Sequence, residues 1–155
     1  MRKISQLVLC VALTLSIGAI SGVATASGVN GWYQTLNKPV FNPPNYLFGP
    51  VWTVLYLLMG SSFYLILQSE PSGLKKRAVL IFCIQLFLNF LWSFLFFKFQ
   101  LVGMAFVEIM AIWISILILL VTFHKINKTA AYLQIPYFLW VSFASVLNAA
   151  IWILN

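Results

Sequence analysis

Five long apolar stretches constrain this chain more than any other feature of its sequence. Each is long enough to cross about 30 Å of hydrocarbon at roughly 1.5 Å per helical residue. They lie near residues 5–26, 47–68, 76–97, 103–124 and 130–153, with a long polar, Pro-rich loop at 27–46. Within lipid every backbone group needs an internal partner, and helices provide one. The sequence therefore predicts an all-α membrane protein, one domain over residues 1–155, built as a bundle of five transmembrane helices.

Composition excludes the soluble classes. Hydrophobic residues make up 63% of the chain and charged residues 7%, whereas roughly a quarter of the residues in ordinary soluble domains are charged. The net charge of +7 would suggest nucleic acid in a soluble protein. Here the basic residues lie in short loops between apolar stretches, where they set topology. Nucleic acid is not an expected partner.

The basic residues are divided unevenly between the two ends of the predicted bundle. One end carries seven of them and the other only Lys38 and Lys98; the seven are Arg2, Lys3, Lys75, Lys76, Arg77, Lys125 and Lys128. Short loops rich in Lys and Arg stay on the cytoplasmic side. The sequence therefore predicts an amino terminus inside the cell and a carboxyl terminus outside.

The first apolar stretch has two interpretations. Arg2-Lys3, an apolar core, and Ala24-Thr25-Ala26 before Ser27 fit a cleavable signal peptide. Gly18, Gly22 and Ala26 instead form a face of small residues that suits helix packing in a bilayer. The residues alone leave both interpretations open.

Polar side chains within the predicted spans are costly unless they face a partner or a cavity. Gln85, Asn89, Trp92 and Phe96 share one helix face, and so do Trp140, Ala144, Leu147, Asn148 and Ile151. Such stripes of indole, carboxamide and small side chains suggest a cavity for a flat apolar ligand. They are equally consistent with a packed bundle in which the amides bond between helices.

Glu108 is the acidic residue within the spans. It suits either a proton relay or a neutral carboxyl group bonded to a neighbouring hydroxyl or indole. We favour the second role, because a proton path needs more than one titratable group and the spans contain no second acidic residue. Cys10, Cys83 and the single His124 have no metal-type spacing, so no metal site is expected. The templates of hydrolytic and phosphate-binding enzymes are missing from the sequence.

Motifs in the long loop and in the last four stretches carry a family resemblance. The first loop and second stretch read G-W-Y-x2-L-x-K-P-x-F-x-P-P-x3-F-x3-W-x3-Y over residues 31–56. Later stretches add Leu88-Asn89-x2-Trp92, the acid Glu108, and Pro136-Tyr137-x2-Trp140-x2-Phe143-Ala144-x2-Leu147-Asn148. In order and length this set resembles the tryptophan-rich sensory protein (translocator protein) family, as a bacterial-type member. The family retains its first helix, which favours retention of residues 1–26.

The resemblance implies a five-helix bundle in the bacterial cell membrane, usually a homodimer joined through the third helix, with a pocket under the first loop. The implied ligands are protoporphyrin, as ligand or substrate rather than as a resident cofactor, related tetrapyrroles and other flat lipophiles. The implied ligand-binding residues are Tyr33, Pro43, Trp52, Gln85, Asn89, Trp92, Trp140, Ala144, Leu147 and Asn148.

Three functions follow from the resemblance and the spans. Some bacterial members degrade protoporphyrin in light and oxygen, and by position Trp52 and Trp140 would be the residues involved. The alternative is a sensor or carrier of tetrapyrroles or lipids without chemistry. A weaker alternative is a proton-coupled exporter that uses Glu108. The sterol motif of animal members needs a Tyr followed by a basic residue, and residues 148–155 contain neither, which argues against cholesterol as the ligand.

Overall fold

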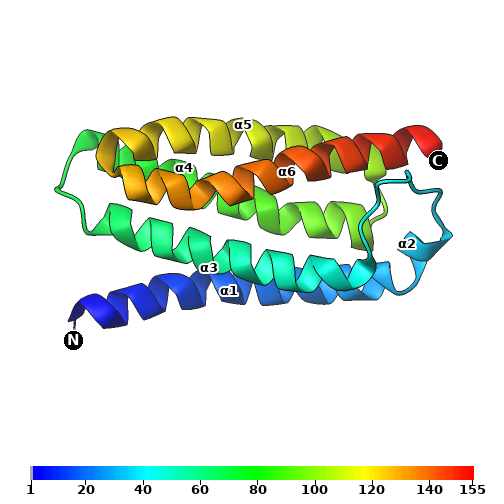
Figure 1. The fold of residues 1–155 in the computed structure, drawn as a ribbon, viewed down its shortest axis with the longest axis horizontal. Helices are drawn as coiled ribbons and strands as arrows, with labels where there is room; N and C mark the ends of the chain where they lie inside the picture. Colours follow the sequence, from blue (N-terminus) through cyan, green and yellow to red (C-terminus); the bar gives the residue numbers. More distant parts are fainter. Residues whose placement is uncertain (1) are drawn as a thin grey trace.

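The computed structural model describes residues 2–155 as a bundle of long helices that run side by side along one axis (Figure 1). Within this part of the chain, five helices are long and apolar enough to cross a membrane, which confirms the predicted fold class. They are α1 (Arg2–Val29), α3 (Phe48–Leu67), α4 (Gly73–Ser93), α5 (Val102–Ile126) and α6 (Lys128–Leu154). The two ends of the chain lie at opposite ends of the bundle (Figure 1).

The long loop is shorter than predicted. The helix α1 continues to Val29, a short helix α2 covers Trp32–Thr35, and a 3-10 turn at Asn45–Leu47 leads directly into α3. The prediction of one loop over 27–46 was therefore wrong at both ends. A Cβ at Gly28 would overlap the Phe97 side chain, so this glycine lets the end of α1 pack closely against Phe97.

The remaining loop is attached to the carboxyl end of α6. Asn155 Oδ1 accepts from the Asn37 backbone N–H at 2.9 Å, and Asn155 Nδ2 donates to the Asn37 carbonyl at 2.9 Å. These two bonds hold the loop over the end of the bundle where α2 lies, as the cyan trace beside the carboxyl terminus shows (Figure 1).

Tight connections close the opposite end. Asn127 joins α5 to α6 and caps α6, with its Oδ1 accepting from the Ala130 N–H at 3.0 Å. Lys75 Nζ donates to the carbonyls of Leu67 and Ser69 at 2.7 and 2.6 Å, which satisfies the end of α3. Because these links are so short, neighbouring helices are held antiparallel.

The half of the bundle near these tight connections is filled by aromatic side chains. Phe63 of α3 stacks on Phe82 of α4 with ring centroids 4.2 Å apart, and Phe82 faces Phe123 of α5 at 6.4 Å. All three rings are buried. The open space of the molecule therefore lies in the other half, beneath the loop and α2.

The helices α1 and α3 pack through small residues at mid-length. A Cβ at Gly60 would lie 2.6 Å from the Val11 Cα atom, and a Cβ at Gly18 would overlap the Tyr56 ring. Thr14 Oγ1 donates to the Tyr56 carbonyl at 2.8 Å across the same contact. Of the small residues expected to suit helix packing, Gly18 therefore packs closely within the molecule, whereas a Cβ at Gly22 would meet no atom within 4 Å.

Candidate ligand cavity

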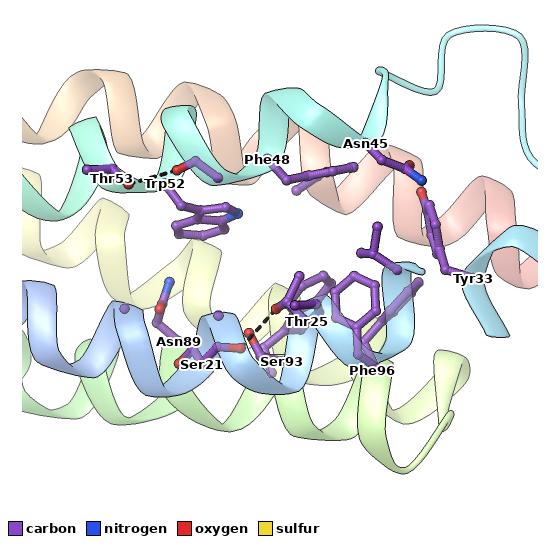
Figure 2. Close-up of a pocket in the computed structure, with 18 of the residues that line it drawn as sticks. Ser21, Thr25, Tyr33, Asn45, Phe48, Trp52, Thr53, Asn89, Ser93 and Phe96 are labelled. Carbon is purple, nitrogen blue, oxygen red and sulfur yellow. Dashed lines mark hydrogen bonds between the residues drawn. The ribbon is translucent and has the colours of Figure 1, made fainter. Parts of the chain in front are cut away.

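A cavity of about 880 Å³ lies between α1 and α3, with α4 and α6 behind it (Figure 2). Its lining is mostly aromatic and apolar, with hydroxyl and amide groups from several helices. Volumes of roughly 300–1,000 Å³ with a few placed polar groups are typical of small-molecule sites. The cavity is therefore large enough for a polycyclic ligand.

Two tryptophans form aromatic walls. Trp52 of α3 points into the space above α1 (Figure 2) and lies against Tyr56 and Tyr137, with ring centroids 5.6 and 6.2 Å away. Trp140 of α6 lies against Phe48 and Phe143 at 6.3 and 5.6 Å. Both indoles line the cavity and are only partly buried. They present ring faces that a flat ligand could contact.

A buried hydrogen-bond chain supports the inner end of the cavity. Tyr56 donates to Asn89 Oδ1 at 2.5 Å, and Asn89 Nδ2 donates to the Tyr137 hydroxyl at 2.9 Å. The Tyr137 hydroxyl donates to Gln85 Oε1 at 3.0 Å. Because the chain joins α3, α4 and α6, it fixes the amide orientation of Asn89 and holds the three helices in register.

A second polar contact holds the α4 wall against α5 and α6. Trp92 Nε1 donates to Asn148 Oδ1 at 3.2 Å, and Asn148 Nδ2 donates to the Val102 carbonyl at 3.0 Å. The carbonyl belongs to the first residue of α5, so the pair ties three helices together. The Trp92 ring also stacks on Phe96, with centroids 5.1 Å apart.

Tyr33 of α2 closes the loop end of the cavity. Its side chain is buried against Phe48, Phe96 and Phe97, with ring centroids 5.7 to 6.4 Å away. Its hydroxyl donates to Asn42 Oδ1 at 2.5 Å, and burial raises the pKa of Tyr33 to about 12. A π-helical turn at Phe94–Lys98 allows two consecutive residues, Phe96 and Phe97, to be buried together.

The structure brings most of the predicted ligand-binding residues to one cavity. Those that line it are Tyr33, Trp52, Asn89, Trp92, Trp140, Ala144, Leu147 and Asn148. Gln85 does not, because it is fully buried beneath Asn89 and bonds to Tyr137. Pro43 is also absent from the lining.

Sequence reasoning missed the contribution of α1. Ser21 and Thr25 line the cavity beside Gly18 and Gly22 (Figure 2). The spacing of one helical turn between Ser21 and Thr25 marks a common face. That signal was visible in the sequence, but the face was interpreted as a packing surface.

Glu108 lies apart from this site. It is not part of the cavity lining, and both carboxyl oxygens are buried without a hydrogen-bond partner among the described residues. The expectation that a neighbouring hydroxyl or indole bonds to it was therefore wrong.

Comparison with known proteins agrees with this architecture. The model of the TspO/MBR family matches residues 10–153. This chain belongs to the TspO/MBR family. The tryptophan-rich protein TspO of Chlorobaculum tepidum is 40% identical to this chain, over 99% of this chain and 98% of the relative. The tryptophan-rich protein TspO of Archaeoglobus fulgidus is 41% identical, over 99% of each chain. The tryptophan-rich sensory protein of Cereibacter sphaeroides is 33% identical over 88% of this chain and 87% of its own.

Membership of the TspO/MBR family, together with the five apolar helices, makes this an integral membrane protein. A human relative named translocator protein is 33% identical over 90% of this chain and 85% of its own length. The TspO/MBR match over residues 10–153 includes every residue that lines the cavity.

Proposed function

We propose that this protein is a membrane receptor for protoporphyrin-type tetrapyrroles and similar flat lipophiles, and that it promotes their breakdown in light and oxygen. The observation that carries the proposal is the cavity of about 880 Å³ with two partly buried indoles in its walls. Aromatic faces bind a flat macrocycle by stacking. A family with members named sensory protein and translocator protein fits a receptor of this kind.

The proposed chemistry uses oxygen as the oxidant. A porphyrin excited by light converts O2 into reactive oxygen species, which attack the macrocycle. An indole in contact with the excited porphyrin can pass an electron to it, and the porphyrin radical anion then gives that electron to O2 to form superoxide. The indole radical cation recovers an electron from the porphyrin, which is left oxidised by one electron; Trp52 and Trp140 both line the cavity. The walls keep the macrocycle beside these indoles while the reaction proceeds.

Conservative tryptophan variants test the proposed chemistry. Trp52→Phe and Trp140→Phe keep an aromatic face but are much harder to oxidise. Each variant is expected to slow light-dependent loss of bound protoporphyrin by about ten-fold, equivalent to about 1.4 kcal/mol in the barrier, with a smaller change in affinity. Absorbance of the purified protein in light and in darkness measures the rate, and fluorescence titration measures the affinity.

Trp152→Phe is the matched control. Trp152 is exposed and packs on Phe106 of α5, outside the cavity lining, so its replacement is expected to leave both quantities unchanged. If the two cavity variants bind less protoporphyrin yet degrade the bound fraction at the normal rate, indole oxidation is not part of the reaction.

The alternative is a sensor or carrier that binds the same ligands without chemistry. The lining supports it, because it offers stacking surfaces and neutral hydrogen-bonding groups without an acid–base pair. Equal loss of protoporphyrin with and without the protein in light would favour this alternative. An exporter that uses Glu108 gains no support, because Glu108 lies outside the cavity lining.

A further inference from the structure

A second and much smaller void adjoins the cavity. Its volume is about 10 Å³, whereas that of the cavity is about 880 Å³. Four residues line both spaces: Trp52, Asn89, Trp92 and Ala144. The volume of the void is roughly that of one water-sized sphere, so the void has room for one small molecule.

The far wall of the void is aliphatic. It consists of Ile109 and Ile112 of α5 and Val141 of α6, which are 3%, 2% and 1% exposed. None of the described residues of α5 lines the cavity. The void therefore lies on the α5 side of the cavity, in the interior of the bundle.

The void offers too few hydrogen-bond partners for water. Asn89 is the amide in its lining, and both ends of this amide are engaged: Oδ1 accepts from Tyr56, and Nδ2 donates to Tyr137. A buried water typically makes about three hydrogen bonds. The second N–H of Asn89 supplies at most one, so an apolar molecule suits the void better than water does.

The indole nitrogens do not supply the missing partners. Trp92 Nε1 donates to Asn148, and the nitrogen of Trp52 points toward Phe48 (Figure 2). Trp52 lines both spaces, so a molecule in the void and a ligand in the cavity would both contact this residue. A molecule in the void would therefore lie beside an indole that the proposed function makes an electron donor.

We infer that the void is a binding site for O2, which it holds beside the cavity ligand, between Trp52 and the aliphatic wall. Apolar cavities in proteins bind small uncharged guests such as xenon. O2 is likewise apolar and is more soluble in hydrocarbon than in water. The role of O2 as oxidant rests on the proposed function, but the existence of the site does not.

Bound O2 takes part in the electron transfer of the proposed function. The porphyrin radical anion loses one electron and O2 gains it, so the porphyrin returns to its ground state and superoxide forms. The void shortens the path of this electron, because it adjoins the cavity that holds the macrocycle. An anion is strongly disfavoured in an apolar void, so superoxide is expected to leave toward the cavity.

Krypton tests the site without any porphyrin. It is an apolar atom close to O2 in width, and its anomalous X-ray scattering locates it in crystals of the full chain under gas pressure. We expect krypton in the void, between Trp52 and Val141. Ordered water in the void, or krypton bound only elsewhere, would overturn the inference.

Two variants that fill the void test its occupancy. Val141→Ile adds one methylene, and Ile112→Met introduces a flexible side chain that fills irregular gaps. Each is expected to lower krypton occupancy about ten-fold, and if one variant fails to fold the other remains as the test. Val146→Ile is the matched control, because Val146 is exposed on the same helix and lines neither space. Krypton occupancy as high in the void-filling variants as in Val146→Ile would overturn the inference.

Flash photolysis tests the role of O2 in the site. The triplet state of bound protoporphyrin is followed by transient absorption at increasing O2 pressure. O2 already in the void needs no diffusion, so a fast phase of quenching is expected whose amplitude grows with O2 pressure. This amplitude should fall about ten-fold in Val141→Ile and stay unchanged in Val146→Ile. Equal amplitudes in the two variants would overturn the role assigned to the void.

The krypton results are independent of the porphyrin assays. If protoporphyrin fails to bind but krypton occupies the void and is excluded by the void-filling variants, the proposed function falls and the site stands. If protoporphyrin is bound and degraded but krypton does not enter the void, the inference falls and the proposed function stands.

Discussion

Asn89 is at the centre of the buried hydrogen bonds beside the cavity. Its amide accepts from Tyr56 and donates to Tyr137, so one side chain orients two buried tyrosine hydroxyls from different helices. The Tyr137 hydroxyl in turn donates to Gln85. Within a membrane these groups have no water to replace a lost partner.

Replacing this amide should destabilise the bundle. Asn89→Leu keeps a side chain of similar size but leaves the hydroxyls of Tyr56 and Tyr137 without their shared partner. The expected loss of stability is about 1–2 kcal/mol, since an unsatisfied buried polar group costs about 1–3 kcal/mol. Thermal unfolding in detergent measures it.

Gln68→Leu provides the amide control for this prediction. Gln68 is exposed and bonds to Gln6 at 2.7 Å, so its replacement should change the unfolding temperature little. Equal shifts of the unfolding temperature in Asn89→Leu and Gln68→Leu would contradict a specific role for the buried hydrogen bonds of Asn89.

At the scale of elements, the close contact between α1 and α3 requires glycine at Gly60 but not at Gly22. A Cβ at Gly60 would lie 2.6 Å from the backbone of Val11 and 2.7 Å from Thr14 Oγ1, whereas a Cβ at Gly22 would meet nothing within 4 Å. An overlap with backbone atoms of α1 can be relieved only if the whole helix moves away from α3. Replacement by alanine is therefore expected to change stability in opposite directions at Gly60 and Gly22.

Gly60→Ala should separate α1 from α3 and lower stability by about 1–3 kcal/mol, the usual cost of overpacking. Gly22→Ala should be neutral or slightly stabilising, because alanine favours the helical state over glycine. Unfolding temperatures of the two variants measure the difference. A larger loss in Gly22→Ala than in Gly60→Ala would show that the packing of α1 against α3 is not as described.

Retention of α1 is a separate prediction at this scale. This helix contributes Ser21 and Thr25 to the cavity and packs on α3 through Thr14, so a protein without it would lack one wall of the site. We expect the intact mass of membrane-purified protein to include residues 1–26. A mature chain that begins at Ser27 would establish the signal-peptide interpretation instead.

For the whole molecule, the distribution of basic residues predicts orientation. The two ends of the chain lie at opposite ends of the bundle (Figure 1), and seven of the nine Lys and Arg residues belong to the end with the amino terminus. That end is expected to face the cytoplasm. The loop after α2 is then expected to lie outside.

Cysteine labelling in intact cells tests this orientation. In a chain in which Cys10 and Cys83 are replaced, Thr35→Cys should react with a reagent that does not cross membranes, and Gly73→Cys should react only after lysis. The reverse pattern would contradict the predicted orientation.

Much of this molecule follows from local sequence pattern. Apolar stretches long enough to span a bilayer predicted all five helices, because lipid leaves a chain no other way to satisfy its backbone. The common face of Asn89, Trp92 and Phe96 followed from helical periodicity, and all three line the cavity. Membership of the family followed from motifs spread over the same helices.

The tertiary structure decided what local pattern does not contain. Gln85 shares its helix face with Asn89, yet it does not line the cavity: it is fully buried, and Tyr137 of α6 bonds to both amides. Glu108 was expected to bond to a neighbouring hydroxyl or indole, but both of its carboxyl oxygens are buried without a hydrogen-bond partner among the described residues. Periodicity places a residue on a face of its own helix, but whether that face meets a cavity or a packed neighbour depends on how the helices approach one another. For α1 and α3 that approach is close at Gly60 and open at Gly22, and the open part is where the cavity lies.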